Sequence, residues 1–334
     1  MSQPIPDPRH PFPTPGRRRL LRAATALPLL PLLPLTACTG QPVFTSTFLQ
    51  VWRSHLELGQ AEWHQRLKAV RALGCSEIVL QWAAVDGEQP WQIPEALLDF
   101  LFDDGGQLGL RIRLGLPYDE RWWQALGAPD AATLPRFLAQ TRARSLAYAE
   151  QAKWPGRSNF SGWYIPYELE QHNWGTPQRQ ALLVPWLQSI ASATSAGGTP
   201  QPAISTYYSR LPSSGTLEGL WAVILDQVAI RPMIQDGVGV NGLDNYQALA
   251  PLLALLRTRE ISFDLIVELF QELPSQDAAT FKAVSASLLR LQPQLAIARR
   301  TGGQQLVAFA LDPWVIGESS QAKQLLEAWR ELSE

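Results

Sequence analysis

The chain alternates between short apolar runs and longer amphipathic stretches. Runs such as 76–82 (SEIVLQW) and 263–270 (FDLIVELF) are almost continuously apolar, which is typical of strands whose two faces are both covered. Stretches such as 60–74 (QAEWHQRLKAVRALG) repeat their apolar residues at helical spacing. Strands separated by helices pair in parallel, because the crossover requires a helix-sized connection.

Eight strand–helix units follow one another after residue 43. The predicted strands span 48–52, 76–82, 110–116, 161–168, 202–208, 228–236, 263–270 and 305–311. The predicted helices span 60–74, 94–109, 131–152, 176–193, 215–225, 245–259, 277–298 and 319–332. A doubly wound open sheet shows the same alternation, but the number of repeats favours an α/β fold of the (β/α)8 TIM barrel type. We expect a single barrel domain over residues 44–334.

The first residues have the pattern of an export signal. Arginines at 17–19 and 22 precede the short apolar run ALPLLPLLPLTAC, whose prolines argue against a spanning helix. The run ends in LTAC (35–38), which resembles a bacterial lipobox, the signal in which the cysteine becomes the lipidated first residue. We expect a signal peptide over 1–37, lipidation of Cys38 and a short tether over 38–43. The protein would then be a lipoprotein of the bacterial cell envelope, on the periplasmic or outer-membrane side; the alternative is an unmodified cysteine after a signal peptide.

Composition narrows the possible partners. The formal net charge is -2 over 334 residues, and no basic block follows the signal, so a nucleic-acid partner has no electrostatic support. The chain holds 13 tryptophans. Most are expected to pack in the core, whereas any at strand ends could stack on sugar rings.

Two glutamates end apolar strands that are far apart in the sequence. Glu168 ends the fourth predicted strand (GWYIPYELE) and Glu268 ends the seventh (VELF). In a TIM barrel the active site lies at the carboxyl ends of the strands, and strands four and seven face each other across the mouth. Glycoside hydrolysis uses such a pair, because one carboxyl group protonates the leaving oxygen and the other attacks the anomeric carbon or activates water. The alternative for each glutamate alone is a solvated or salt-bridged loop carboxylate.

Further polar and aromatic residues follow the predicted strands. Asp236 ends the sixth strand, where it could bind a sugar hydroxyl, raise the pKa of a neighbouring glutamate by like-charge repulsion, or cap the following turn. Amides can bind sugar hydroxyls and aromatic rings can stack on sugar faces, although core packing is the alternative for each. The other candidate substrate-binding residues are Gln50, Trp52, Gln81, Trp82, His172, Trp174, Tyr207, Tyr208 and Trp314.

These motifs together resemble a known bacterial family. The segments FLQVW, IVLQW, GWYIPYELE, IQDGVG and VELF are similar to those of the glycosidase-like TIM barrels grouped as domain of unknown function 4434. The layout also resembles the large glycoside hydrolase clan with catalytic glutamates on strands four and seven. The resemblance implies Glu168 as acid/base and Glu268 as the second carboxylate. That clan usually has Asn before the acid/base glutamate, whereas this chain has Tyr167.

Two other chemistries have weaker support. Residues 237–242 (GVGVNG) match the GxGxxG spelling of dinucleotide-binding loops. They lie in the sixth unit rather than the first, and glycines for a tight turn after Asp236 explain the spelling more simply. His55, His64 and His172 lack the paired spacing of metal ligands. We therefore expect neither a cofactor nor a metal.

Two functions remain open. The first is an exported, lipid-anchored glycoside hydrolase that acts on a polysaccharide or oligosaccharide. The second is a non-catalytic carbohydrate-binding lipoprotein on the same barrel. The carboxylate pair separates them, since a hydrolase requires two opposed glutamates and a binding protein does not.

Overall fold

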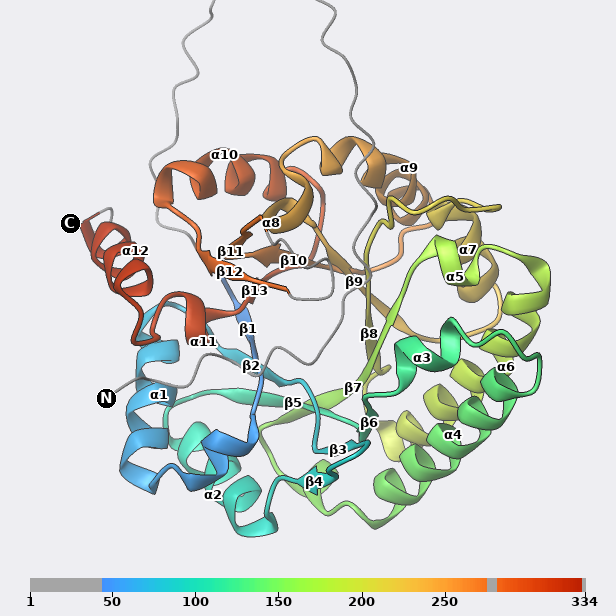
Figure 1. Cartoon of the computed structure of the whole chain (residues 1–334). Coiled ribbons are helices and arrows are strands. Elements are labelled where there is room, and N and C mark those ends of the chain that lie inside the picture. Colours follow the sequence, from blue (N-terminus) through green and yellow to red (C-terminus); the bar gives the residue numbers. More distant parts are fainter. Residues whose placement is uncertain (1–43, 275–280, 332–334) are drawn as a thin grey trace, which may run out of the picture.

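A computed structural model describes residues 44–274 and 281–331 of the chain. Eight parallel strands form a closed barrel in the order β1-β13-β10-β9-β8-β7-β5-β2, which confirms the predicted TIM barrel (Figure 1). The strands are β1 (Ser46–Leu49), β2 (Glu77–Leu80), β5 (Arg111–Gly115), β7 (Phe160–Leu169), β8 (Ala203–Thr206), β9 (Arg231–Gln235), β10 (Asp264–Glu268) and β13 (Gln305–Phe309).

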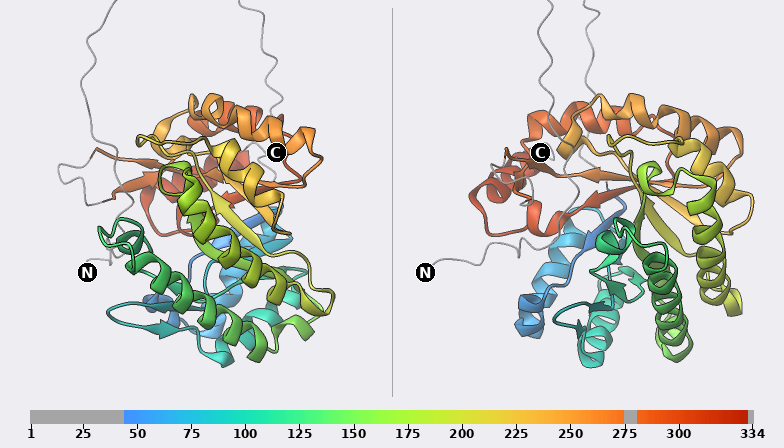
Figure 2. Two further views of the ribbon diagram at one scale, coloured as in Figure 1. Left: turned by 90° about the vertical axis from the view of Figure 1, so that its right-hand side faces the viewer. Right: turned by 45° about the vertical axis from the view of Figure 1, so that its right-hand side comes forward.

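Helices surround the barrel, and Figures 1 and 2 show them as an outer ring. The longer helices are α1 (Gln60–Ala72), α2 (Glu95–Gln107), α4 (Thr133–Gln151), α6 (Pro177–Thr194), α7 (Leu217–Leu225), α9 (Asn245–Thr258), α10 (Leu288–Ala298) and α12 (Ser320–Glu331). Shorter helical turns are η1 (Arg53–Glu57), α3 (Trp122–Leu126), η2 (Trp154–Gly156), α5 (Gln171–Trp174), η3 (Ala196–Gly198), α8 (Val238–Asn241) and α11 (Leu311–Trp314). Threonine and serine hydroxyls cap several of these helices, as when Thr176 accepts a hydrogen bond from the Arg179 amide at the start of α6.

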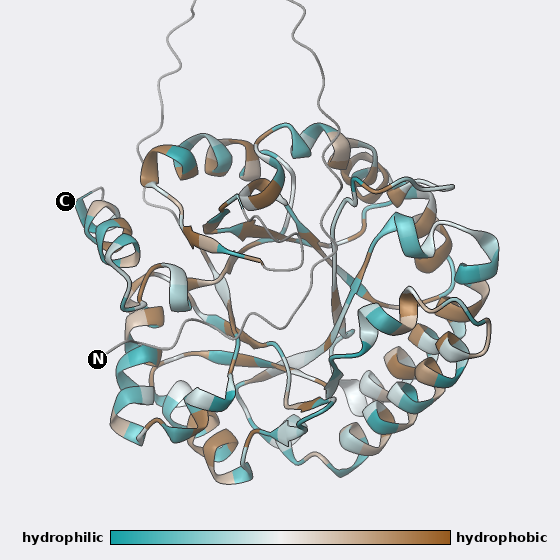
Figure 3. Cartoon of the chain, in the orientation of Figure 1, coloured by the Kyte–Doolittle hydropathy of each residue, from teal (hydrophilic) through white to brown (hydrophobic). Residues whose placement is uncertain are grey.

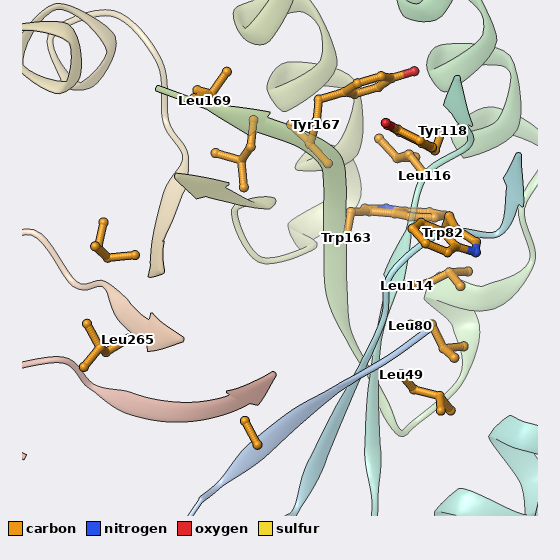
Figure 4. Packing of buried hydrophobic residues seen from close by; sticks show 14 of the residues in the cluster. Leu49, Leu80, Trp82, Leu114, Leu116, Tyr118, Trp163, Tyr167, Leu169 and Leu265 are labelled. Atoms are coloured by element: carbon orange, nitrogen blue, oxygen red, sulfur yellow. The ribbon is translucent and has the colours of Figure 1, made fainter. Parts of the chain in front are cut away.

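The helices pack on the barrel through apolar faces. Figure 3 shows hydrophobic and hydrophilic stretches side by side on the ring of helices. The larger core lies between the helices and the outer faces of the strands, and Figure 4 shows part of it, with Trp82, Trp163 and Tyr167 among its side chains. Burial of apolar surface in this layer is the main force that holds the helices to the sheet.

A second apolar cluster fills the inside of the barrel. It consists of Phe48, Val79, Tyr164, Ala203, Met233, Ile266, Val307 and Ala310. At the amino ends of the strands, Arg231 of β9 forms a two-point ion pair with Asp264 of β10. The barrel is therefore a packed core rather than a pore, and its carboxyl-end mouth lies above this apolar layer.

Two small sheets lie outside the barrel. One joins β3 (Ala84–Asp86), β4 (Trp91–Gln92) and β6 (Tyr118–Asp119), and the other is the antiparallel pair of β11 (Phe270–Glu272) and β12 (Ala283–Ser285). The second pair corrects the predicted helix over 277–298, because 283–285 form a strand and α10 begins only at Leu288. Ser287 sets that start, since its hydroxyl caps the helix by accepting a hydrogen bond from the Arg290 amide.

The expected signal peptide (1–37), Cys38 and the tether (38–43) lie outside the described residues. Among the helices that the structure does describe, none has both the length and the apolar character of a membrane span.

Candidate active site at the barrel mouth

The carboxyl ends of the strands bring amides and carboxylates into one ring. Side chains alternate along a strand, so Gln50, Gln81, Gln235 and Glu268 follow the inward-facing Phe48, Val79, Met233 and Ile266 by two positions. Gln50, Gln81 and Gln235 are partly exposed. Glu168 joins this ring, because it accepts a hydrogen bond from the Gln235 amide at 2.5 Å.

Glu168 follows the inward-facing Tyr164 by four positions on β7, so strict alternation turns its side chain toward the mouth. The pairing of β7 with β8 is interrupted between Ile165 and Leu169. Glu168 is partly exposed, and its charge acts on Tyr118, Tyr164 and Tyr207. Burial raises the pKa of Glu168 to about 7, and the hydrogen bond from Gln235 opposes that shift.

Glu268 ends β10 and is only 5% exposed. One of its side-chain oxygens, Oε2, accepts a hydrogen bond from the Gly239 amide at 2.8 Å. Burial raises the pKa of Glu268 to about 8, with further increases from the negative charges of Asp236 and Glu168. Glu168 therefore acts on Glu268 across the mouth, with a smaller effect than Asp236.

Asp236 does not lie where a sugar could touch it. It has no exposed surface, and both side-chain oxygens accept hydrogen bonds from protein groups. This departs from the expectation that it binds substrate directly, because the turn after β9 folds over it. Gly237 allows that turn through a positive φ of 63°. A side chain at Gly239 would come within 2.9 Å of Glu268 Oε2. A glycine at this position therefore leaves room for the Glu268 side chain.

The expected aromatic platforms divide into accessible and buried residues. Trp52, Tyr207, Tyr208 and Trp314 are partly exposed, and Trp314 packs against the inner barrel cluster. Trp82 is 4% exposed, and its indole N–H donates to the Val51 carbonyl. Trp174 is fully buried beside Trp122, so its ring has no free face for a sugar.

His172 is exposed, and its Nδ1 bonds the Pro212 carbonyl oxygen.

Tyr167 is directed away from the two glutamates. Tyr167 is 1% exposed, and its ring lies beside Tyr118 (Figure 4) and also packs against Trp122. Its hydroxyl oxygen accepts a hydrogen bond from the Asp119 amide. Tyr167 therefore does not replace the sugar-binding asparagine of the glycosidase clan. Its hydroxyl lines a hollow of about 290 Å³ together with Asp119 and Arg144, off the barrel mouth and without either glutamate.

Gln235 is the site residue that sequence reasoning missed. It precedes Asp236 and shares its face of β9 with Met233, so strict alternation from an inward Met233 would have indicated it. Glu170, two residues beyond Glu168, is 1% exposed and caps α5 by accepting hydrogen bonds from the His172 and Asn173 amides. Within the described ranges, no three His, Cys, Asp or Glu side chains gather as a metal site.

The closed parallel barrel with its outer helices defines a TIM-barrel protein. The chain belongs to the family described as Domain of unknown function (DUF4434), whose sequence model matches residues 44–324. The expected family is thereby confirmed.

Known proteins resemble the chain at the level of the fold. A proposed α-L-fucosidase from Bacteroides thetaiotaomicron superposes with a TM-score of 0.68 at 16% identity, over 93% of this chain and 99% of that one. The spore cortex-lytic enzyme SleL of Bacillus cereus superposes with a TM-score of 0.55 at 10% identity, over 88% of this chain and 74% of that one.

A relative by sequence is the uncharacterized protein YbcH of Escherichia coli. It is 23% identical over 189 residues, or 56% of this chain. The matched region spans 62% of YbcH.

Proposed function

We propose that this protein is a glycoside hydrolase that cleaves an oligosaccharide or polysaccharide with Glu168 and Glu268. The observation that supports this most directly is the placement of the two glutamates. Glu168 is the penultimate residue of β7 and Glu268 is the last residue of β10, so both lie at the carboxyl-end mouth. The charged neighbours of Glu268 are Asp236, Arg290 and Glu168, in that order of effect on its pKa, and carboxyl groups with raised pKa values in such a place are candidates for catalysis.

The proposed division of labour follows the chemistry of glycoside cleavage. Glu168 donates a proton to the leaving oxygen, for which a pKa near 7 is suited because the group can hold a proton at neutral pH. Glu268 is the second carboxylate, either as nucleophile or as the base that activates water. Its oxygen is oriented by the Gly239 amide, and it must lose its own proton before it acts.

The surrounding residues suit a carbohydrate. Gln50, Gln81 and Gln235 present amides at the mouth, and Trp314 offers a partly exposed indole at its rim. Amides hydrogen-bond hydroxyls, and flat aromatic faces stack on sugar rings. The solved structures with a similar fold include proteins described as a fucosidase and a cortex-lytic enzyme, and this agrees with a carbohydrate substrate. We further propose that the protein is exported and lipid-anchored through Cys38.

The test compares two variants on a panel of oligosaccharides, polysaccharides and aryl glycosides. Glu168→Gln should lower the rate on natural glycosides by about 10²-fold or more, and much less on activated aryl glycosides, whose leaving groups need no proton. Glu268→Gln should abolish turnover of both kinds of substrate.

The matched control is Glu170→Gln, a buried carboxylate two residues beyond Glu168 that caps a helix. Per folded molecule it should retain activity. If no substrate of the panel is cleaved but one binds, the non-catalytic carbohydrate-binding protein becomes the better description. If both site variants keep near-normal turnover, the two-carboxylate mechanism is wrong.

A further inference from the structure

Asp236 is held by four donors inside the wall behind the mouth. Its Oδ1 accepts hydrogen bonds from the amides of Glu268 and Val238, each at 3.2 Å. Its Oδ2 accepts one from the Tyr246 hydroxyl at 3.0 Å and one from the Gln294 amide at 2.5 Å. Burial raises the pKa of Asp236, and the four hydrogen bonds act against that shift because they stabilise the ionised form.

Gln294, one of these four donors, and Arg290 also hold the main chain of Glu268. Gln294 donates to the Glu268 carbonyl at 3.2 Å. Arg290 donates to the carbonyls of Glu268 and Phe270, both at 2.9 Å, and to the Gln294 side-chain oxygen at 2.8 Å. The amide of Glu268 therefore bonds Asp236, and its carbonyl bonds α10, so the end of β10 is clamped from both sides.

The charged groups that face Glu268 come from three elements. Asp236 approaches from β9 and Glu168 from β7, and both disfavour a negative charge on Glu268. Arg290 approaches from α10 and favours that charge. Tyr246 of α9 faces Asp236 rather than Glu268. Among the described residues, the Glu268 side chain accepts one hydrogen bond, from Gly239, and Asp236 accepts four. A proton is therefore better placed on Glu268.

We propose that Asp236 is a positioning residue for Glu268. It fixes the main chain at the end of β10 and supplies a permanent negative charge that keeps Glu268 protonated in the resting protein. The effect of Asp236 on catalysis rests on the proposed hydrolase function. The clamp and the charge are properties of the folded protein alone, however, and can be measured without a substrate.

The test follows the free energy of unfolding between about pH 6 and 9 in four proteins: the native chain, Asp236→Asn, Glu268→Gln and the double variant. A glutamate that keeps its proton only when folded makes the protein lose stability as the pH rises through that range. Asp236→Asn should reduce this loss, because Glu268 would give up its proton at lower pH. In the Glu268→Gln background, the same substitution should leave the pH dependence unchanged.

The asparagine is a close replacement in shape. Its oxygen can keep the two amide donors, and the Tyr246 hydroxyl can rotate to accept from the new NH2 group. Gln294 stays in place, because its oxygen accepts from Arg290 and its NH2 group donates to the Glu268 carbonyl. A stability loss that is equal at every pH would mean that Asp236 is purely structural, and would overturn the proposal. An effect of equal size in both backgrounds would overturn it too, because the charge would then not act through Glu268.

A measurement on the native protein covers the case in which Asp236→Asn does not fold. Carboxyl carbons of 13C-labelled Asp and Glu are followed by NMR during a pH titration, and Glu268 is assigned by its loss in Glu268→Gln. Glu268 should titrate above neutral pH and after Asp236. The assignment would be refuted if Glu268 titrated in the ordinary range of glutamates. It would also be refuted if Asp236 still held its proton after Glu268 had lost its own. Neither result depends on hydrolysis, so a failure of this proposal can be distinguished from a failure of the proposed function.

Discussion

At the scale of single residues, Glu168 and Glu268 differ in what sets their proton affinity. Glu168 is affected mainly by burial and by one amide donor, Gln235. Glu268 is affected by burial and by two neighbouring negative charges, of which Asp236 has the larger effect. The surroundings of Glu268 therefore do not favour its ionisation at neutral pH, and its charge state depends on pH within the physiological range.

This predicts a bell-shaped pH dependence of hydrolysis. With apparent pKa values of about 7 and about 8, both groups are protonated well below pH 7 and no base is available. Both are ionised well above pH 8, and no acid is available. Activity should be highest between the two values and fall about tenfold per pH unit on each side. Because Glu268 has the higher pKa, the productive form, with its proton on Glu168, is the less populated of the two singly protonated forms, and the apparent values belong to the pair. An optimum below pH 5, measured as kcat/KM across pH, would contradict the raised pKa values.

Trp314 is the aromatic residue that best fits sugar stacking, because it is partly exposed and borders the inner cluster at the mouth. We expect an oligosaccharide substrate to change the tryptophan emission of the native protein and to change it much less in Trp314→Phe. Trp154→Phe is the matched control, since Trp154 is buried against Phe102 outside the barrel. An unchanged signal in Trp314→Phe, with binding confirmed by calorimetry, would exclude stacking on this ring.

At the scale of elements, the two ends of the strands serve different purposes. The carboxyl ends of β7, β9 and β10 carry the mouth residues Glu168, Gln235 and Glu268, whereas the amino ends of β9 and β10 are joined by an ion pair. Arg231 of β9 donates to Asp264 of β10 from Nε at 2.7 Å, and Asp264 is 2% exposed. A buried ion pair is poor evidence of net stabilisation, but removing one partner leaves an unpaired buried charge.

Asp264→Ala should therefore destabilise the protein by about 3–5 kcal/mol in urea unfolding. The control is Asp226→Ala, which removes an ion pair with Arg259 of similar length, 2.7 Å, but with an aspartate side chain that is 62% exposed. That change should cost at most about 1 kcal/mol. Equal costs for the two variants would show that the base of the barrel does not depend on this pair. Neither residue lies at the mouth, so activity per folded molecule should not change.

At the scale of the whole molecule, the proposed lipid anchor would attach the barrel to a membrane at the face where the strands begin. β1 begins at Ser46, only eight positions after Cys38 in the sequence, and strands begin at the face opposite to the active mouth. An anchor at Cys38 would therefore place the base of the barrel toward the membrane and leave the mouth accessible to carbohydrate.

The prediction is that the native protein partitions into the membrane fraction with the mass of a lipidated chain that starts at Cys38. Cys38→Ser should release the protein or leave the signal peptide uncleaved. Cys75→Ser is the control, because Cys75 is a buried core residue and its replacement should not change localisation. A Cys38→Ser protein that remains membrane-bound with an unaltered mass would exclude the lipobox interpretation.

The sequence alone was sufficient for the eight-unit barrel and for the positions of Glu168 and Glu268. Strand and helix periodicity is local information, and the end of an apolar strand can be located from a few neighbouring residues. The same local information was insufficient at 277–298, because KAVSA suits a strand edge as well as a helix and only its pairing with β11 settles the choice.

Tertiary structure decided the roles around those two glutamates. Asp236 meets Gln294 across 58 positions and Glu268 across 32, and Gln235 meets Glu168 across 67. Trp174 and Trp314 both follow apolar strands, yet one is fully buried and the other is partly exposed. Burial, donor number and neighbouring charge set a carboxylate's proton affinity and an indole's accessibility. These quantities arise only when segments far apart in the chain pack together.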